Sequence, residues 1–281
     1  TPSGHRLYSE KDVQRVRRLQ ELLLQGLSLK EAVTAFETDS EGTQANALSS
    51  SLPANGIGAD AWQGYLQETL RALEDFSTER LDALYNEACA IYPIDILTQN
   101  LLIPVLKQLG MTWETRPSGI AEEHFFSAWL RNKLGARLHH TVGLSKGKPL
   151  LLACLPHEHH EIGMLLFALG ALHRGFRVTY LGSNLPIRQI IHVVRKAPTA
   201  GIVLAGRDID DPAPMLADIA WLRASAKLPV FVGSHFSVQN HDTLQSQGAI
   251  PVGNHIGLGL DIIEHHLRKL KRDAVASQTG T

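Results

Sequence analysis

The pattern of apolar and polar positions changes three times along this chain. Residues 9–25 and 29–36 place apolar side chains at helical spacing, which predicts two helices. Residues 38–58 lose this spacing and are rich in Ser, Asn, Gly, Thr and Ala. A segment of that composition cannot bury enough apolar surface to order itself, so we expect a flexible linker there.

A helical pattern returns after the linker. The expected helices cover about 60–75, 78–91, 93–110 and 118–141. Apolar residues at helical spacing would fill their common core, for example Leu97, Leu101, Val105 and Leu109. Because the connections are short, neighbouring helices should be antiparallel, and residues 59–145 are predicted to form a four-helix bundle.

From Lys148 onward, short continuous apolar runs alternate with amphipathic segments. The expected strands are 149–155, 177–181, 200–205, 229–232 and 250–252. The expected helices are 160–174, 187–197, 213–226, 240–248 and 256–270. This alternation predicts a Rossmann-like (flavodoxin-like) domain over residues 146–271, with a parallel sheet covered on both faces. We expect residues 272–281 to be a disordered tail.

Composition limits the class of protein. Of 281 residues, 44% are hydrophobic and 20% charged, which is ordinary for a globular protein. No apolar run reaches the roughly 18–20 residues that span a bilayer, so we expect no membrane association. Cys89 and Cys154 are the two cysteines and fit buried thiols in a reducing cytoplasm. The net charge is −1, but residues 1–20 are rich in Arg and Lys, so a nucleic-acid surface should lie at this end.

A cluster of histidines and carboxylates follows the first predicted strand. It runs Leu-Pro-His-Glu-His-His-Glu-Ile-Gly over residues 155–163. Ligands of parallel sheets bind beyond the carboxyl ends of the strands, which is where this cluster falls. The zinc-protease pattern His-Glu-x-x-His is absent because position 161 is Glu. From the cluster alone, a zinc site that uses two of the histidines and a polar loop that caps the next helix both stay open.

Three short motifs at three predicted strand ends narrow the choice. They are Glu158-x-His160-x-x-Gly163, Ser183-x-Leu185 and Gly233-Ser234. Together they resemble the cobalamin-binding domains in which a histidine displaces the lower base of the cofactor. The usual family signature there is Asp-x-His-x-x-Gly, Ser-x-Leu and Gly-Gly. Here Glu158 replaces the Asp, and Ser234 replaces the second Gly.

The resemblance implies a role for each of these residues. His160 would be the lower axial ligand of cobalt, and Glu158 would orient its imidazole. Gly163 would leave room for the displaced nucleotide tail. Ser183 and Leu185 would contact that tail, and Gly233 and Ser234 would line its slot.

The helical segment resembles one subgroup of this family more closely. Trp113 precedes Glu123-His124 by ten residues, which is similar to the light-responsive MerR-type regulators of the CarH and LitR group. The resemblance implies that Trp113, Ile120, Glu123 and His124 face the upper side of the cofactor. There an indole forms an apolar lid and a carboxylate accepts hydrogen bonds from ribose hydroxyls. Some members carry His after the Trp, as a ligand that replaces the adenosyl group, whereas this chain has Glu114. Without the downstream motifs, Trp113 would be interpreted as bundle core.

The first residues complete the resemblance. The segment Thr-Pro-Ser-Gly-His-Arg-Leu-Tyr over residues 1–8, followed by a capped helix, is similar to the wing of a MerR-type winged helix. Residues 1–37 would be the C-terminal part of such a domain, with His5, Arg6 and Tyr8 contacting DNA. The base-reading helices of the family are not among these 281 residues, so we expect this chain to bind DNA weakly or not at all.

Three functions follow as hypotheses. The resemblance implies a transcription regulator, a repressor, that binds adenosylcobalamin and forms a homo-oligomer, a tetramer in the dark, which light disassembles. An alternative is a similar regulator that does not use cobalamin or binds another tetrapyrrole. The third is a corrinoid carrier subunit of a methyltransferase, which would lack the wing segment and the spacing of Trp113 to Glu123-His124. No catalytic acid or nucleophile is evident in the sequence, so we expect a non-enzyme.

Overall fold

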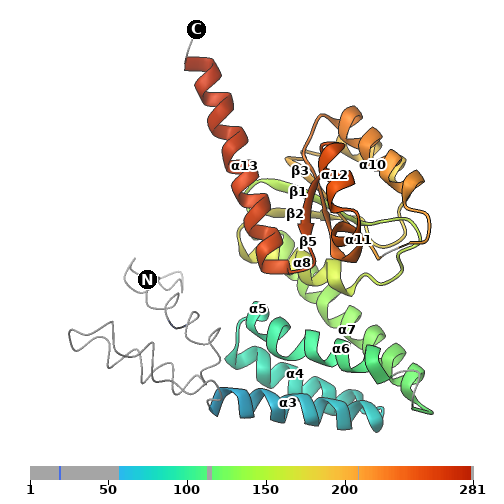
Figure 1. The fold of residues 1–281 in the computed structure, drawn as a ribbon. Coiled ribbons are helices and arrows are strands. Elements are labelled where there is room, and N and C mark those ends of the chain that lie inside the picture. The colour runs from blue at the N-terminus through green and yellow to red at the C-terminus, as the bar shows by residue number, and fades with distance from the viewer. Residues whose placement is uncertain (1–18, 20–56, 113–115, 208, 280–281) are drawn as a thin grey trace, which may run out of the picture. The chain divides into compact units, whose positions relative to one another are not determined.

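The computed structural model describes residue 19 and residues 57–112, 116–207 and 209–279. Within these ranges, side chains are described for residue 19 and for residues 61–112, 116–207 and 209–270. The chain divides into two compact units, 1–126 and 127–281. The predicted winged-helix segment 1–37 lies outside the described residues apart from residue 19, and so does the predicted linker up to residue 56. Each unit is described by itself below (Figure 1).

The first unit is helical. Its elements are α3 (Ile57–Glu74), α4 (Thr78–Ile91), α5 (Ile94–Leu97), η1 (Thr98–Leu102), α6 (Ile103–Thr112) and the start of α7 (Gly119–Val142). Ser77 caps α4, since its hydroxyl accepts the backbone N–H of Arg80 at 3.3 Å. The predicted helix 93–110 is in fact three consecutive segments, because η1 is a π-helical turn within it. Residues 57 and 58 belong to α3 and not to the predicted linker.

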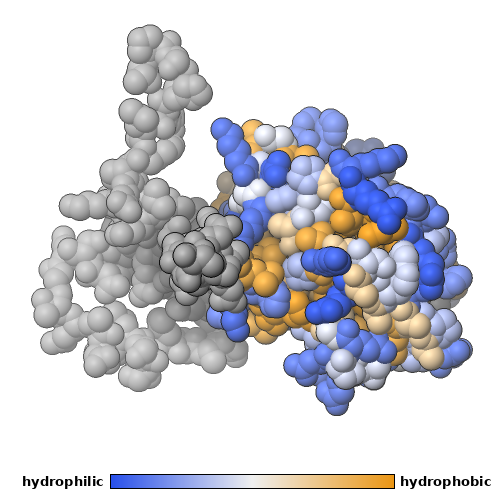
Figure 2. All heavy atoms as spheres, turned by 90° about the horizontal axis from the view of Figure 1, so that it is seen from above, coloured by the Kyte–Doolittle hydropathy of each residue, from blue (hydrophilic) through white to orange (hydrophobic). Residues whose placement is uncertain are grey.

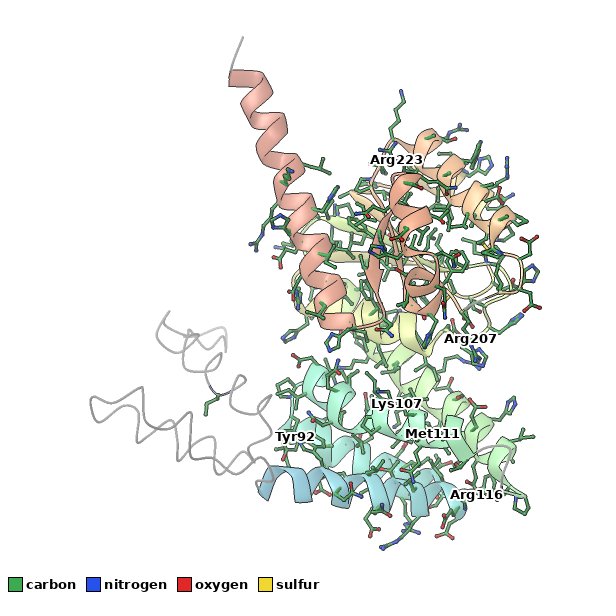
Figure 3. The ribbon with its side chains drawn as sticks, in the orientation of Figure 1. Tyr92, Lys107, Met111, Arg116, Arg207 and Arg223 are labelled. Atoms are coloured by element: carbon green, nitrogen blue, oxygen red, sulfur yellow. The ribbon has the colours of Figure 1, made fainter. Side chains whose placement is uncertain are left out.

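The core of this unit follows the predicted stripe. Leu97, Leu101, Val105 and Leu109 are at most 3% exposed, as expected from their helical spacing. One carboxylate is buried with them. Glu122 is 2% exposed; it accepts a hydrogen bond from the Ser118 hydroxyl at 2.6 Å and lies 3.4 Å from Arg116. Arg116, labelled in Figure 3, also pairs with Glu74 on α3, so this network joins the start of α7 to α3.

The second unit contains a five-stranded parallel sheet. Its strands are β1 (Pro149–Cys154), β2 (Arg177–Tyr180), β3 (Gly201–Ala205), β4 (Val230–Gly233) and β5 (Ile250–Gly253). They lie in the order β2-β1-β3-β4-β5, and every neighbouring pair is parallel. This is the flavodoxin-like order, in which ligands bind where the strand order reverses, beside β1. The predicted Rossmann-like fold class is confirmed.

Helices cover both faces of this sheet (Figure 1). They are α8 (Ile162–His173), α9 (Ile187–Val194), α10 (Ala213–Ala226), α11 (Ser234–Gln239), α12 (His241–Ser246) and α13 (Ile256–Thr279). One apolar core combines α9, α10, α11 and α12 with the inner strands and includes Leu155, Met215 and Phe236. α8 packs closely on α13, where a side chain added at Gly170 would come within 3.1 Å of Leu260.

Two predicted elements differ in the structure. The predicted helix 240–248 is present as α12 over His241–Ser246, and a short helix that was not predicted, α11, begins at Ser234, directly after β4. The predicted disordered tail 272–281 is wrong over residues 272–279, because α13 continues to Thr279. Residues 271–279 hold good helix formers such as Lys, Arg, Ala and Gln, and neither Gly nor Pro.

Among the described helices, none is long and apolar enough to cross a membrane. The face shown in Figure 2 has hydrophobic residues lying between hydrophilic ones. On α13, Leu258, Ile262 and Leu270 are exposed.

Candidate functional site

The loop after β1 is held by backbone bonds to both neighbouring strand ends. Leu155 N–H donates to Ala205 O of β3 at 2.9 Å, and Asn184 N–H, after β2, donates to Glu158 O at 3.0 Å. The side-chain oxygen of Asn184 accepts the N–H of His157 at 2.9 Å. His157 and Asn184 both have positive φ angles, 66° and 52°. Asn tolerates that conformation better than most residues, so Asn184 suits this position.

Within this loop, Glu158 orients His160. One carboxylate oxygen of Glu158 accepts the backbone N–H of His160 at 2.7 Å and lies 3.0 Å from its ring Nδ1. The Glu158 side chain is 6% exposed, whereas that of His160 is 64% exposed. A carboxylate only accepts, so this contact suits the ring tautomer that carries its proton on Nδ1. The structure therefore presents an oriented imidazole whose Nε2 is not used by Glu158.

A pocket of about 300 Å³ lies beside His160. Its polar residues come from the β1 loop, His157 to His160, and from Arg207 after β3. Its apolar residues include Leu155, Ile209, Met215 and Phe236. Phe236 N–H donates to Gly206 O at 3.1 Å, which ties the start of α11 to the end of β3. A pocket with an apolar floor and a few polar groups at its rim is typical of a cofactor site.

The other predicted tail residues lie around these strand ends but do not line the pocket. Ser183 is half-buried after β2, and Leu185 packs against the apolar core that includes Leu155 and Phe236. Gly233 ends β4, where an added Cβ would lie 3.3 Å from Val252. Ser234 has a φ of 69°, a conformation that favours glycine. Gly163 is exposed in the first turn of α8, with no other group within 4 Å of where its Cβ would be.

A second carboxylate of the loop is used differently. Glu161 accepts the Tyr180 hydroxyl at 2.6 Å and lies 3.4 Å from the Arg131 guanidinium. Burial, and then the hydrogen bond to Glu161, raise the pKa of Tyr180 well above its usual range. Burial, followed by the charges of Glu158 and Glu161, raises the pKa of Cys154 to about 12. Cys154 is therefore a protonated core residue and not a nucleophile.

The predicted upper-face residues belong to the first unit. Ile120 and His124 are exposed and Glu123 is half-buried, all in the first turns of α7. Trp113 and Glu114 lie outside the described residues, as do His5, Arg6 and Tyr8 of the predicted wing. The buried carboxylate of this region is Glu122, which pairs with Ser118 and Arg116.

Three residues of the site were missed from the sequence: Asn184, Gly206 and Arg207. Gly206 and Arg207 directly follow the third apolar run, so their place at a strand end was a signal that could have found them. Asn184 occupies the middle of the Ser-x-Leu motif, and its role depends on the β1 loop beside it. In the part of the chain that the structure describes, no three His, Cys, Asp or Glu side chains are grouped as a metal site.

Two family models match this chain. Residues 1–38 match the MerR HTH family of regulatory proteins, and residues 65–138 match a B12 binding domain. The second match covers residues 65–126 of the helical unit and the first residues of the sheet unit, 127–138. The predicted resemblance to MerR-type cobalamin-dependent regulators is confirmed, and the B12 match supports cobalamin binding by this chain.

The chain is also similar to two proteins that are named as transcriptional repressors. The chain is 30% identical over 193 residues to the HTH-type transcriptional repressor CarH of Myxococcus xanthus, covering 68% of this chain and 62% of that protein. It is 27% identical over 251 residues to the repressor CarA of the same organism, covering 88% and 80%. The match thus spans about three fifths of the length of CarH. These relatives are named as repressors and not as enzymes, which agrees with the predicted non-enzyme.

A solved structure agrees with the fold. The monomethylamine corrinoid protein of Methanosarcina barkeri superposes with a TM-score of 0.56 at 14% identity, covering 72% of this chain and 97% of that one. At this identity the likeness shows the fold alone.

Proposed function

We propose that this chain is a light-responsive transcription regulator, a repressor, that binds adenosylcobalamin with His160 as the lower axial ligand of cobalt. The domain matches and the two repressor relatives support a cobalamin-binding regulator. The adenosyl form, the light response and the ligation by His160 are the parts that we add.

The observation that carries the proposal is the pairing of buried Glu158 with exposed His160. A histidine that ligates a metal commonly donates its other ring N–H to a carboxylate, which orients the ring and raises its basicity. Glu158 meets this requirement with an oxygen 3.0 Å from Nδ1. The donor set thus fits a metal centre that takes one protein ligand from this loop.

The strand-end residues would hold the displaced tail of the cofactor. Ser183 would donate a hydrogen bond to the tail, and Leu185 would contribute to an apolar wall. Gly233 and Ser234 would line the slot, and Gly163 would leave space beside His160. The open surroundings of Gly163 and the positive φ of Ser234 support these roles.

The helical unit would supply the upper face of the site. In this proposal Trp113 covers the adenosyl group, Glu123 accepts hydrogen bonds from its ribose, and Ile120 and His124 contact the same side. Ile120 and His124 are exposed, which leaves these two side chains accessible to a ligand, and Glu123 is half-buried beside them in the sequence. Because residue 114 is Glu and not His, this position could not supply a histidine that ligates cobalt after the adenosyl group is lost.

Regulation would follow from a difference in binding between two assemblies. Adenosylcobalamin supplies a cobalt–carbon bond that light breaks. If the intact cofactor binds a homotetramer more tightly than separated chains, darkness favours the tetramer and light favours its dissociation. Operator DNA would be contacted by a winged-helix domain of which His5, Arg6 and Tyr8 form part.

The alternative function is a corrinoid carrier subunit for methyl groups, which would use the same His160 loop. The likeness to the monomethylamine corrinoid protein supports the shared fold alone. The MerR match over residues 1–38 favours the regulator, because a methyl carrier has no need of a DNA-binding segment.

An absorption experiment tests the proposal. The chain is mixed with adenosylcobalamin in the dark, desalted, and illuminated with green light, beside His160→Ala and His159→Ala. We expect the parent chain and His159→Ala to retain a cofactor that changes spectrum on illumination. His160→Ala should retain less or show a different spectrum in the dark.

Size-exclusion chromatography before and after illumination then reports the assembly. A retained cofactor without a change in elution would contradict the proposed light-driven disassembly. If no cofactor survives desalting, His160 is a loop histidine and the cobalamin-independent regulator becomes the better proposal.

A further inference from the structure

Arg207 lies at the same pocket as His160 and has no assigned role. It follows Gly206 directly after β3, its side chain is exposed, and it lines the pocket beside the β1 loop. Figure 3 labels it at the opposite end of the sheet unit from Arg223. Other arginines of this unit pair with carboxylates, as Arg131 does with Glu161 and Arg188 with Asp218. Arg207 has no hydrogen bond or ion pair with any residue that the structure describes.

The backbone around Arg207 is nevertheless firmly placed. The carbonyl of Ala205 accepts the N–H of Leu155 at 2.9 Å, and the carbonyl of Gly206 accepts the N–H of Phe236 at 3.1 Å. A Cβ on Gly206 would lie 2.8 Å from Leu155, so β3 approaches the β1 loop as closely as glycine allows. A fixed backbone with an uncommitted guanidinium is what a ligand-binding arginine requires.

The charges around the pocket point to an anion. Arg207 is the only permanently cationic side chain among the described residues that line it. The one carboxylate among them, Glu158, is buried and engaged with His160. Asp211, further along the loop, accepts the backbone N–H of Ala213 at the start of α10. Asp210 is exposed and does not line the pocket.

We infer that Arg207 forms a phosphate subsite for the nucleotide tail of the cofactor. This inference rests on the proposed function. A displaced tail carries a single phosphodiester between the corrin and its flat terminal base. The rim of the pocket, where His160 and Arg207 both lie, suits this phosphate. A guanidinium binds phosphate oxygens through two parallel N–H groups, and this makes Arg a better match than Lys.

The test compares two corrinoids that differ in the tail. Equilibrium dialysis in the dark measures the binding of adenosylcobalamin and of adenosylcobinamide, which lacks the nucleotide tail and its phosphate. The variants are Arg207→Met, Arg207→Lys and the control Arg195→Met. Arg195 is exposed at the C-terminal end of α9, before β3 begins, and does not line the pocket, so the control removes the same charge away from it.

We expect Arg207→Met to weaken adenosylcobalamin binding about tenfold, as for loss of a charge-assisted hydrogen bond. Arg207→Lys should fall between Arg207→Met and the parent chain, and Arg195→Met should match the parent. Binding of adenosylcobinamide should be the same in all four proteins. Raising the salt concentration should reduce the difference between the parent and Arg207→Met.

The outcomes separate the two proposals. If the parent chain binds adenosylcobalamin through His160 but Arg207→Met binds it equally well, the subsite is overturned and the proposed function stands. An equal loss for both corrinoids would also overturn the subsite, because it would show an effect on the loop and not on the phosphate. If the parent chain binds neither corrinoid, the proposed function fails and the subsite fails with it.

Discussion

One carboxylate oxygen of Glu158 lies 2.7 Å from the backbone nitrogen of His160 and 3.0 Å from its ring Nδ1. The two residues are separated by one position, so the loop must turn sharply for a single oxygen to reach both groups. Asn184 supports this turn from the neighbouring strand end, through its side chain to His157 and its backbone to Glu158. The orientation of the imidazole therefore depends on two strands and not on the loop alone.

Replacing Glu158 tests this relationship. Glu158→Gln keeps the size of the side chain and one accepting oxygen but removes the charge that favours a protonated Nδ1. We expect adenosylcobalamin binding to weaken about tenfold, the lower end of the usual effect of such a change beside a metal ligand. Dialysis in the dark measures this. Glu161→Gln is the matched control from the same loop, and equal losses in both variants would show that Glu158 has no special role.

Ser234 holds a conformation that favours glycine, with a φ of 69°. Ser234→Gly should relieve roughly 1–2 kcal/mol of backbone strain, offset by the roughly 0.5–1 kcal/mol of chain entropy that glycine costs. We expect a free energy of unfolding that is unchanged or higher by up to about 1.5 kcal/mol, measured in urea. Ser234→Val, with a branched side chain in the same conformation, should lower it by about 1 kcal/mol or more. Destabilisation by both substitutions would contradict the strain.

Replacing glycine by alanine should change the free energy of unfolding differently at two positions of the site. A Cβ at Gly206 would meet Leu155 at 2.8 Å, whereas a Cβ at Gly163 would meet nothing within 4 Å. Gly206→Ala should therefore cost about 1–3 kcal/mol of unfolding free energy. Gly163→Ala should cost none, since Ala is the better helix former in α8.

Cofactor binding should respond to Gly163→Ala differently from stability. If the tail passes beside this glycine, Gly163→Ala should weaken adenosylcobalamin binding although the protein stays as stable as the parent. Urea unfolding and dark dialysis on the same preparations separate these two effects. Unchanged binding by Gly163→Ala would place the tail elsewhere.

Cys154 makes stability depend on alkaline pH. Burial raises its pKa from 9.0 to about 12, so folding favours the protonated thiol. Its contribution to stability is complete below the unfolded pKa and is lost as the pH rises from about 9 towards 12.

In Cys89→Ser, where Cys154 is the remaining cysteine, a thiol reagent at pH 8 should react slowly with folded protein and rapidly in urea. Rapid reaction with the folded protein would contradict the burial of this thiol.

The local pattern of the sequence was enough to predict most of the fold. The structure has the five strands and the helices 78–91 and 213–226 where the apolar spacing predicts them. A buried strand needs a continuous apolar run, and a helix with one buried face needs apolar residues at helical spacing, so both patterns are visible in the sequence. The predictions that differ lie where local signals are weak. The π-helical turn in residues 98–102 keeps an apolar helical pattern, and α11 has six residues, too few to show a helical period, and begins directly after β4.

By itself, the sequence also determined that Glu158 and His160 are close, since they are two positions apart. It further determined that the three cobalamin-binding motifs each come after a predicted strand. It did not determine which other side chains meet them. Asn184 contacts the loop because β2 lies beside β1, and Arg207 shares a pocket with His160 because β3 lies on the other side of β1. That neighbourhood follows from strand order, which is decided by packing among residues far apart in the chain. Only the tertiary structure therefore brought an uncommitted arginine to the histidine that the sequence had singled out.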